Sequence, residues 1–207
     1  MSIDSSTKLR TGDFLLFNEH PKKCLMSTLD SIIRCFTSSK YSHAGLVIVD
    51  PPWAPKGTYV WDSSKHTVPD PQDKKIKFGI ALVPIAHYLD QSRGRQILYK
   101  RSPIDPKTYE IFEDPKFLNK LHDNVYGKHY DLTLGHWFAG FMHILIPRTT
   151  DEFFCSAFVS YALTQAGVLN ENTDWTIISP AELSSDNDMN IPWIQKYSTD
   201  TKWPEDF

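Results

Sequence analysis

Cysteine, long apolar runs and excess charge of one sign are all scarce in this sequence. Its three cysteines, an odd number without paired spacing, do not make a disulfide framework. The longest apolar stretch, Trp137 to Pro147, is too short to cross a bilayer. The 22 basic and 25 acidic residues leave a net charge of −3, which provides no basic field for nucleic acid. We therefore expect neither a secreted disulfide scaffold, nor a transmembrane protein, nor a nucleic-acid partner.

Signals for export and for division into several domains are also missing. The N-terminal residues lack the apolar core of a signal peptide, so we expect a cytoplasmic, intracellular protein. No flexible or low-complexity linker interrupts the 207 residues, a length that suits one sizeable core. We therefore predict a single domain over residues 1–207, with a loose N-terminus at residues 1–10.

The stretch from Asp151 to Val168 predicts a helix with one cysteine in its first turn. Its apolar residues recur at helical spacing, Thr150 and Asp151 are good N-caps, and Gly167 is a good C-cap. A thiol there lies near unpaired amides and the positive end of the helix dipole, which favours the nucleophilic thiolate. Cys155 is therefore a candidate nucleophile, and the alternative is a small buried residue.

Two segments predict a β-hairpin that carries a histidine and an acid. The β-branched run Tyr41 to Asp50 and the segment Thr58 to Ser64 are joined by a proline-rich loop of about seven residues, which favours antiparallel pairing. His43 and the end of the second segment should then lie at the same end of the hairpin. The register is not fixed by sequence, so three side chains remain candidates to orient His43: Asp62, Ser64 and His66. The alternative for His43 is a hydrogen-bonded core histidine.

Apolar periodicity predicts the remaining elements. We expect strands at Thr11 to Asn18, Lys77 to Ile85 and Arg95 to Arg101, a helical turn at Ala86 to Asp90, an amphipathic helix at Cys24 to Phe36, helices over Pro106 to Gly127 broken at Pro115, and a short helix that starts at Ser179 and Pro180.

Two patterns that resemble metal sites do not fit one. His122, His129, His136 and His143 recur every seven residues, about 10 Å along a helix, so neighbours could not share an ion. Cys24 and Cys35 lie eleven residues apart without a histidine to complete a site, and we interpret them as buried or idle thiols. We expect no metal and no cofactor.

The order of these segments resembles a known family. "GDFLLF", "YSHAGLVIV", "VWDSS", "FGIALVPIAHYL", "FFCSAFVSYAL" and "ISPAEL" follow one another between Thr11 and Leu183 as in the permuted NlpC-type papain-like thiol hydrolases. That family includes YiiX-like bacterial proteins and poxvirus relatives, and more distantly the lecithin retinol acyltransferase group. In it the histidine strand precedes the cysteine helix, the reverse of papain's order.

The resemblance implies a fold and a set of roles. The fold would be α+β, an antiparallel papain-like sheet with the cysteine helix packed against it and a variable helical and aromatic insert at residues 101–150. Cys155 would be the nucleophile, His43 the base and Asp62 the orienting acid. The Tyr130–Asp131 pair resembles one that shapes the pocket in the family. We add three substrate-pocket candidates: Tyr41, Tyr130 and Trp137.

Two classes of function remain open. The first is a cysteine hydrolase, peptidase-like or acyltransferase-like, that acts through an acyl-enzyme on an amide or an ester of a peptide, lipid or small molecule. The second is a catalytically silent papain-like module that binds a peptide or lipid. Intact Cys155, His43 and Asp62 favour the enzyme, because a decayed enzyme usually loses one of the three roles. Contact with a membrane surface is left open.

Overall fold

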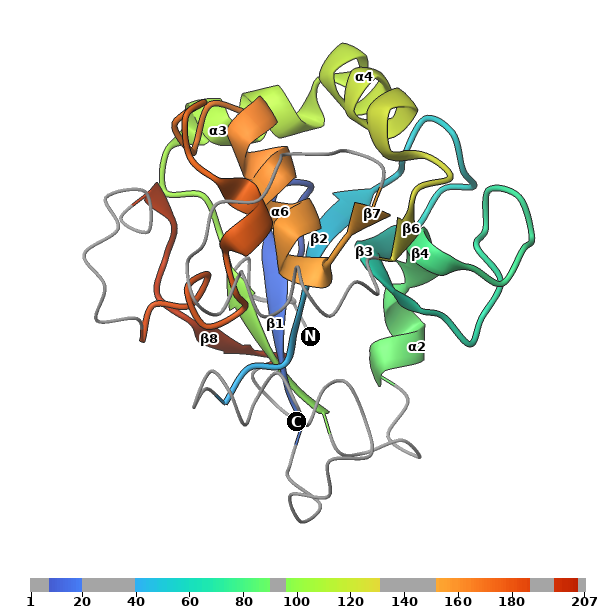
Figure 1. The fold of residues 1–207 in the computed structure, drawn as a ribbon, viewed down its shortest axis with the longest axis horizontal. Coiled ribbons are helices and arrows are strands. Elements are labelled where there is room, and N and C mark those ends of the chain that lie inside the picture. The colour runs from blue at the N-terminus through green and yellow to red at the C-terminus, as the bar shows by residue number, and fades with distance from the viewer. Residues whose placement is uncertain (1–7, 20–39, 90–95, 131–151, 187–195, 205–207) are drawn as a thin grey trace.

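The computed structural model describes residues 8–19, 40–89, 96–130, 152–186 and 196–204, and the fold is built around one sheet (Figure 1). Eight strands follow the order β7-β6-β4-β3-β2-β1-β5-β8. Their bounds are β1 (Phe14–Glu19), β2 (His43–Val49), β3 (Thr58–Lys65), β4 (Phe78–Pro84), β5 (Gln96–Arg101), β6 (His129–Tyr130), β7 (Glu152–Phe153) and β8 (Thr201–Trp203). All neighbours pair antiparallel except β6 and β7, which are parallel.

Helices of the described residues pack on this sheet, which is compatible with the expected α+β class. They are α2 (Ile85–Leu89), α3 (Pro106–Glu113), α4 (Pro115–Val125) and α6 (Cys155–Gln165), with a 3₁₀ turn η2 (Trp175–Ile177). The predicted strands at β1, β4 and β5, the helical turn at α2 and the hairpin of β2 with β3 are confirmed. The predicted helix Cys24 to Phe36 lies outside the described residues. No helix among those described is both long and apolar enough to traverse a bilayer.

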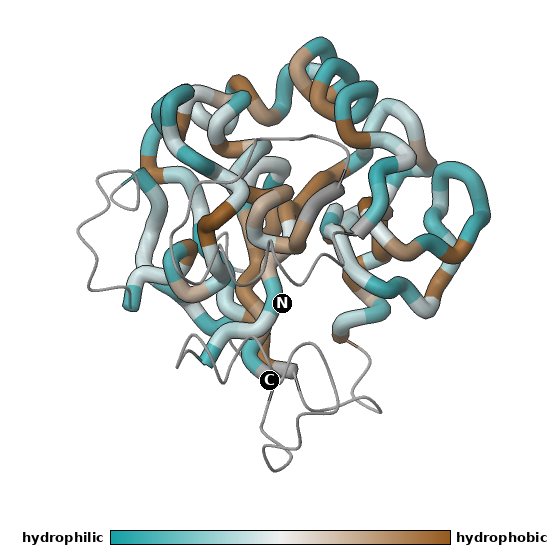
Figure 2. Tube along the Cα trace, in the orientation of Figure 1, coloured by the Kyte–Doolittle hydropathy of each residue, from teal (hydrophilic) through white to brown (hydrophobic). Residues whose placement is uncertain are grey.

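Alternating side chains give the sheet two buried faces. Successive residues of a strand point to opposite faces, and they separate accordingly into two apolar clusters. The larger cluster joins Phe14, Leu46 and Trp61 to residues of α3, α4 and α6. The smaller one joins Leu15, Phe17, Val47, Val60 and Leu98 to α2. Figure 2 shows the hydrophobic trace running through the central strands and α6.

Helix α6 is buried on nearly all sides rather than along one stripe. Every residue from Cys155 to Leu163 is buried, whereas the helical spacing of the apolar residues in the sequence indicates one buried face. Phe158 meets Trp61 of β3 edge to face, with ring centroids 5.0 Å apart. Gly167, at φ +68°, follows the last turn as predicted and allows the chain to leave the helix. A helix enclosed in this way holds its first residue firmly in the core.

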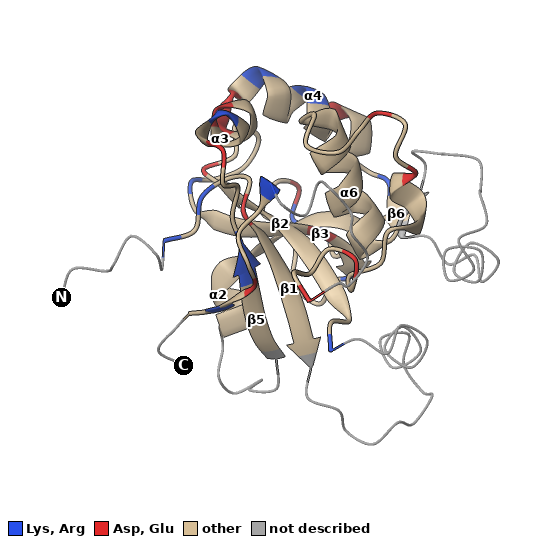
Figure 3. Ribbon diagram, turned by 90° about the vertical axis from the view of Figure 1, so that its left-hand side faces the viewer, with Lys and Arg blue, Asp and Glu red and all other residues tan. Residues whose placement is uncertain are grey.

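The break predicted at Pro115 is confirmed and has a local cause. Asp105 caps α3 by accepting from the Lys107 amide at 3.0 Å, and Asp114 caps α4 by accepting from the Lys116 amide at 2.9 Å. A proline follows each cap at the first helical position, where its missing N–H removes no helical bond. Figure 3 shows basic and acidic residues mixed over α3, α4 and the loops, as the balanced composition suggests.

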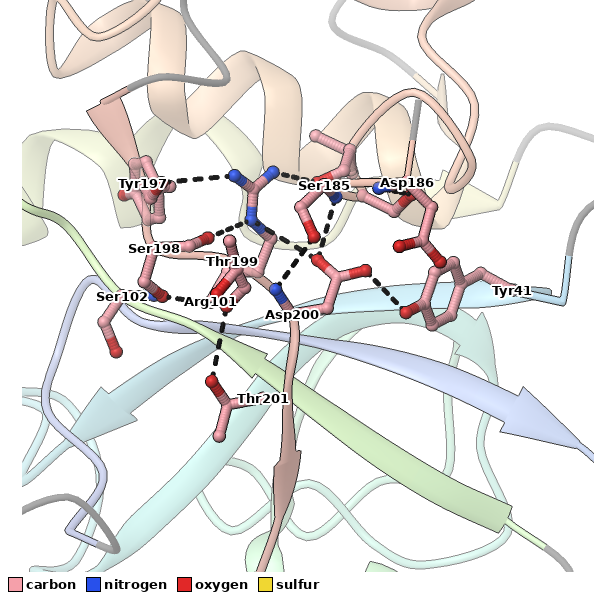
Figure 4. Close-up of polar contacts among 12 residues, drawn as sticks. Tyr41, Arg101, Ser102, Ser185, Asp186, Tyr197, Ser198, Thr199, Asp200 and Thr201 are labelled. Atoms are coloured by element: carbon pink, nitrogen blue, oxygen red, sulfur yellow. Dashed lines mark hydrogen bonds and ion pairs between the residues drawn. The ribbon is translucent and has the colours of Figure 1, made fainter. Parts of the chain in front are cut away.

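The C-terminal segment is fastened to the sheet by a buried ion pair (Figure 4). The guanidinium of Arg101 lies 3.5 Å from Asp200 and donates to three backbone carbonyls of Leu183, Tyr197 and Ser198. Asp200 in turn accepts from the Tyr41 hydroxyl at 2.5 Å and from the Ser185 amide at 2.9 Å. The described residues 183–185 and 197–200 are therefore fixed against β5 by polar contacts as well as by β8.

The prediction of a short helix from Ser179 is wrong beyond the first turn. The predicted start is present as a capping box, because Glu182 accepts from the Ser179 amide at 2.7 Å and donates its own amide to the Ser179 hydroxyl at 3.3 Å. The chain then continues as turns to residue 186 instead of a helix. Leu183, fully buried, and Ser185, bonded to Asp200, hold these turns in place through tertiary contacts.

Candidate active site

Cys155 is the first residue of α6, as the sequence predicts, but the approach to it differs from the prediction. Glu152 and Phe153 form the short strand β7, and Phe154 is the N-cap, so the predicted caps Thr150 and Asp151 do not begin the helix. Phe154 has no polar side chain to bond the amides of the first turn. The Cys155 side chain is almost fully buried, with 2% of the residue exposed.

His43 and Asp62 come from the neighbouring strands β2 and β3. The strands pair with Leu46 opposite Trp61, a register that brings the start of β2 to the end of β3. The Nε2 atom of His43 donates a hydrogen bond to Oδ2 of Asp62. The Asp62 side chain is fully buried, whereas 17% of the His43 side chain is exposed. Cys155 acts on the same imidazole, because its charge and its side chain are among the causes that raise the pKa of His43.

Electrostatics in this group favour a protonated imidazole. Burial alone would lower the pKa of His43, and it is the largest single effect. Cys155 and the charge and hydrogen bond of Asp62 act in the opposite direction and together hold the pKa well above its ordinary value. Burial would likewise raise the pKa of Asp62, but His43, His66 and the Tyr88 hydroxyl lower it overall. An imidazolium and a carboxylate therefore form the stable charge state of this pair.

Of the three residues left open by sequence, the structure places Asp62 against His43. Ser64 lies one strand repeat further along, and its hydroxyl is 3.4 Å from Nδ1 of His66. Nε2 of His66 donates to the Gly79 carbonyl at 2.8 Å, and it lies 3.7 Å from Oδ1 of Asp62. Neither Ser64 nor His66 contacts the His43 ring in these bonds. His66 instead borders the acid on its other oxygen.

Two residues contact the site although no sequence pattern singles them out as site residues. Tyr88 of α2 donates its hydroxyl to Oδ2 of Asp62 at 3.2 Å. Phe17 of β1 lies edge to face against His43, with ring centroids 4.9 Å apart, and against Tyr88 at 5.0 Å. Both were expected only as parts of a strand and of a helical turn. Their contacts depend on how α2 packs below the sheet, which local periodicity does not report.

The pocket candidates have different positions. Tyr41 is buried, and its hydroxyl bonds Asp200 rather than the His43 group. The backbone of Tyr130 lies in β6, which joins β4 to β7. Trp137, like Cys24 and Cys35, lies outside the described residues. The pocket roles of Tyr41, Tyr130 and Trp137 stay predictions.

The histidines of the seven-residue repeat have other surroundings where they are described. His122 stacks on Trp53 at 4.3 Å between ring centroids and contacts Gln72 through Nε2 at 2.8 Å. His129 is in β6, and His136 and His143 are outside the described segments. Within those segments no three His, Cys, Asp or Glu side chains are grouped so as to hold a metal ion.

No protein-family model matches the chain, and no curated protein matches it. The resemblance of its segments to the NlpC-type hydrolases therefore remains a prediction from the residues themselves.

Proposed function

We propose that this protein is a cysteine-dependent hydrolase that works through an acyl-enzyme on Cys155, with His43 as the base and Asp62 as the orienting acid. The observation that carries the proposal is the His43 imidazole, which is bonded to Asp62 and lies close enough to Cys155 for that residue to raise the pKa of His43. Thiol catalysis requires a nucleophile next to a general base, and a further residue that orients the base. The substrate class is an amide, or an ester, of a peptide, lipid or small molecule.

The reaction follows from the three contacts. In the imidazolium form favoured above, His43 already holds the proton of Cys155, and the sulfur attacks the carbonyl carbon of the substrate as a thiolate. His43 then gives the proton to the departing amine or alcohol, which leaves a thioester on Cys155. Water, deprotonated by the same imidazole, attacks the thioester and releases the acid with the thiol restored. Asp62 stabilises the imidazolium in both halves of the cycle.

The start of α6 supports the proposal through its amides. The first N–H groups of a helix have no partner within the helix. Phe154 adds no side-chain acceptor for the amides of the first turn. Such a donor, next to the nucleophilic sulfur, can meet the negative oxygen of the tetrahedral intermediate.

We also propose that the fold is the permuted papain-like form. Chain order supports this, because β2 with His43 and β3 with Asp62 precede α6 with Cys155. Transfer of the acyl group to an alcohol or amine instead of water would make the same centre an acyltransferase. A panel of amide, ester and thioester substrates assayed with and without added acceptors separates the two.

Replacement of each residue tests the mechanism. Cys155→Ala should abolish turnover, His43→Ala should do nearly the same, and Asp62→Asn should be milder, since an amide still accepts from the imidazole but does not stabilise its charge. Cys155→Ala combined with His43→Ala should be scarcely worse than Cys155→Ala, because the two act as a unit. The matched control is Ser160→Ala on the same helix, whose buried hydroxyl has no hydrogen-bond partner among the described residues. Additive losses would contradict the mechanism. Unchanged ligand binding by Cys155→Ala with no turnover of any substrate by wild type would favour the binding module.

A further inference from the structure

The Asp62 carboxylate receives both of its hydrogen bonds on one oxygen. His43 Nε2 and the Tyr88 hydroxyl both donate to Oδ2, the latter at 3.2 Å. The other oxygen, Oδ1, is buried and has no hydrogen-bond partner in the described part of the chain. Nε2 of His66 lies 3.7 Å from Oδ1, beyond hydrogen-bonding distance, and it donates its proton to the Gly79 carbonyl instead. Among the described residues, Tyr88 is thus the single neutral group that donates to Asp62.

Aromatic packing fixes the direction from which the Tyr88 hydroxyl arrives. Tyr88 and Phe17 meet edge to face at 65°, and Phe17 meets His43 in the same manner at 64°. The three rings therefore form a chain on the face of the sheet that α2 covers. Burial, followed by the charge of Asp62, raises the pKa of Tyr88 well above its ordinary value. The hydroxyl accordingly keeps its proton at neutral pH and remains a donor.

We propose that Tyr88 is a positioning residue, which rests on the proposed function of the Cys155 centre: its hydroxyl holds Oδ2 of Asp62 toward His43 and shares that oxygen with the imidazole. A carboxylate with one donor can rotate about its terminal bond, whereas a second donor on the same oxygen fixes which oxygen faces the ring. Sharing also moderates the pull of Asp62 on the imidazole proton, since a carboxylate oxygen that accepts two bonds attracts each donor less. Tyr88 thereby acts on the base without contact with the substrate.

Removal of the hydroxyl has a defined consequence. In Tyr88→Phe, the ring remains against Phe17, and His43 becomes the sole hydrogen-bond donor to a fully buried carboxylate. A protonated imidazole then gains more from this contact than in the wild type. The groups that face the His43–Asp62 pair from the described elements are otherwise the same: Cys155 of α6 and His66, which follows β3. The pKa of His43 should therefore rise in Tyr88→Phe, by about half a unit or more, which is roughly threefold in proton affinity.

Titration of the His43 ring by NMR, on the full chain, measures this shift directly. The rate at which iodoacetate alkylates Cys155 provides a second measure, because an anionic reagent reacts more slowly once the neighbouring imidazolium loses its proton. In a plot of this alkylation rate against pH, the decrease on the alkaline side should move to higher pH in Tyr88→Phe. The control is Tyr109→Phe, which removes a hydroxyl that donates to another buried carboxylate, Asp13, at 2.7 Å. That variant should lose stability without a shift of either profile.

The outcomes distinguish this inference from the proposed function. A rise of the His43 pKa in Tyr88→Phe but not in Tyr109→Phe supports the positioning role. An unchanged or lowered His43 pKa in Tyr88→Phe, or an equal shift in both variants, overturns it. Neither result depends on an acyl substrate, whereas the hydrolase proposal fails on the substrate panel with wild type and Cys155→Ala. A protein that shows the shift but no turnover would retain the Tyr88 coupling and lose only the enzymatic assignment.

Discussion

A single methyl group added at Gly45 should damage the candidate site more than it damages the fold. A Cβ at this position would lie 2.4 Å from Cγ1 of Val60 and 3.1 Å from Cβ of Asp62. Val60 is fully buried and β-branched, so its side chain has little freedom to turn away. Strands β2 and β3 must then move apart, and overpacking of this kind costs about 1–3 kcal/mol. The displacement falls on the two strands that carry His43 and Asp62.

The consequence is measurable by comparison with a second glycine. Gly127→Ala forces a non-glycine residue to φ +77°, where its Cβ meets no atom within 4 Å. Left-handed backbone costs about 1–2 kcal/mol, so both variants should lose comparable stability in urea. Misplacement of catalytic groups by about 1 Å can lower rates by roughly 10²-fold. Gly45→Ala should therefore slow turnover, and alkylation of Cys155 by iodoacetamide, at least about tenfold. Equal alkylation rates in the two glycine variants would refute the reasoning.

Two further predictions concern charge. The pKa of His43 is higher in the folded protein than in the unfolded chain. Its contribution to stability is therefore complete below the unfolded-state pKa of about 6.5, and it is lost as the pH rises through the folded-state pKa. The pKa of Asp62 is lower in the folded protein than in the unfolded chain. Its contribution to stability is therefore complete above the unfolded-state pKa of about 3.9, and it is lost as the pH falls through the folded-state pKa. The urea midpoints of wild type and His43→Gln should accordingly differ most between about pH 4 and 6.5, and a constant difference up to high pH would contradict the ion pair. Asp200→Asn should destabilise the protein by about 3–5 kcal/mol, because it leaves the Arg101 guanidinium buried without its carboxylate. Urea denaturation measures this loss, and a loss below 1 kcal/mol would show the pair to be well solvated.

The hairpin shows what the sequence could predict of this site. The β-branched run after His43, the proline-rich loop and the second short strand all indicate antiparallel pairing, which the structure has. Antiparallel pairing brings the start of the first strand next to the end of the second. This limits the candidates for the partner of His43 to three residues. The choice of Asp62 needed the register, which depends on side-chain packing across both faces of the sheet.

Other features depend on contacts between distant parts of the chain. Tyr88 reaches Asp62 only because α2 folds under the sheet, 26 residues further along the chain. Asp200 meets Arg101 and Tyr41 from the opposite end of the sequence. No local pattern encodes such pairs. The start of α6 was mispredicted for a related reason, because Glu152 pairs with β6 as a strand and so removes the favoured caps from the helix.

One of the unsatisfied buried polar atoms lies at the candidate active site. Three buried side-chain atoms among the described residues lack a hydrogen-bond partner, and Oδ1 of Asp62 is the only one that belongs to a charged group. Such an acceptor costs about 1–3 kcal/mol, and an N-cap without a polar side chain costs about 1 kcal/mol more. Buried charges elsewhere are well paired: Asp13 accepts from Tyr109 and the Arg10 amide, and Arg101 meets Asp200 and three carbonyls. The fold thus pairs its distant charges and leaves one oxygen of Asp62 without a donor next to His43, a locally unsatisfied group of the kind that functional sites tend to hold, and this supports the proposed catalytic role of the centre.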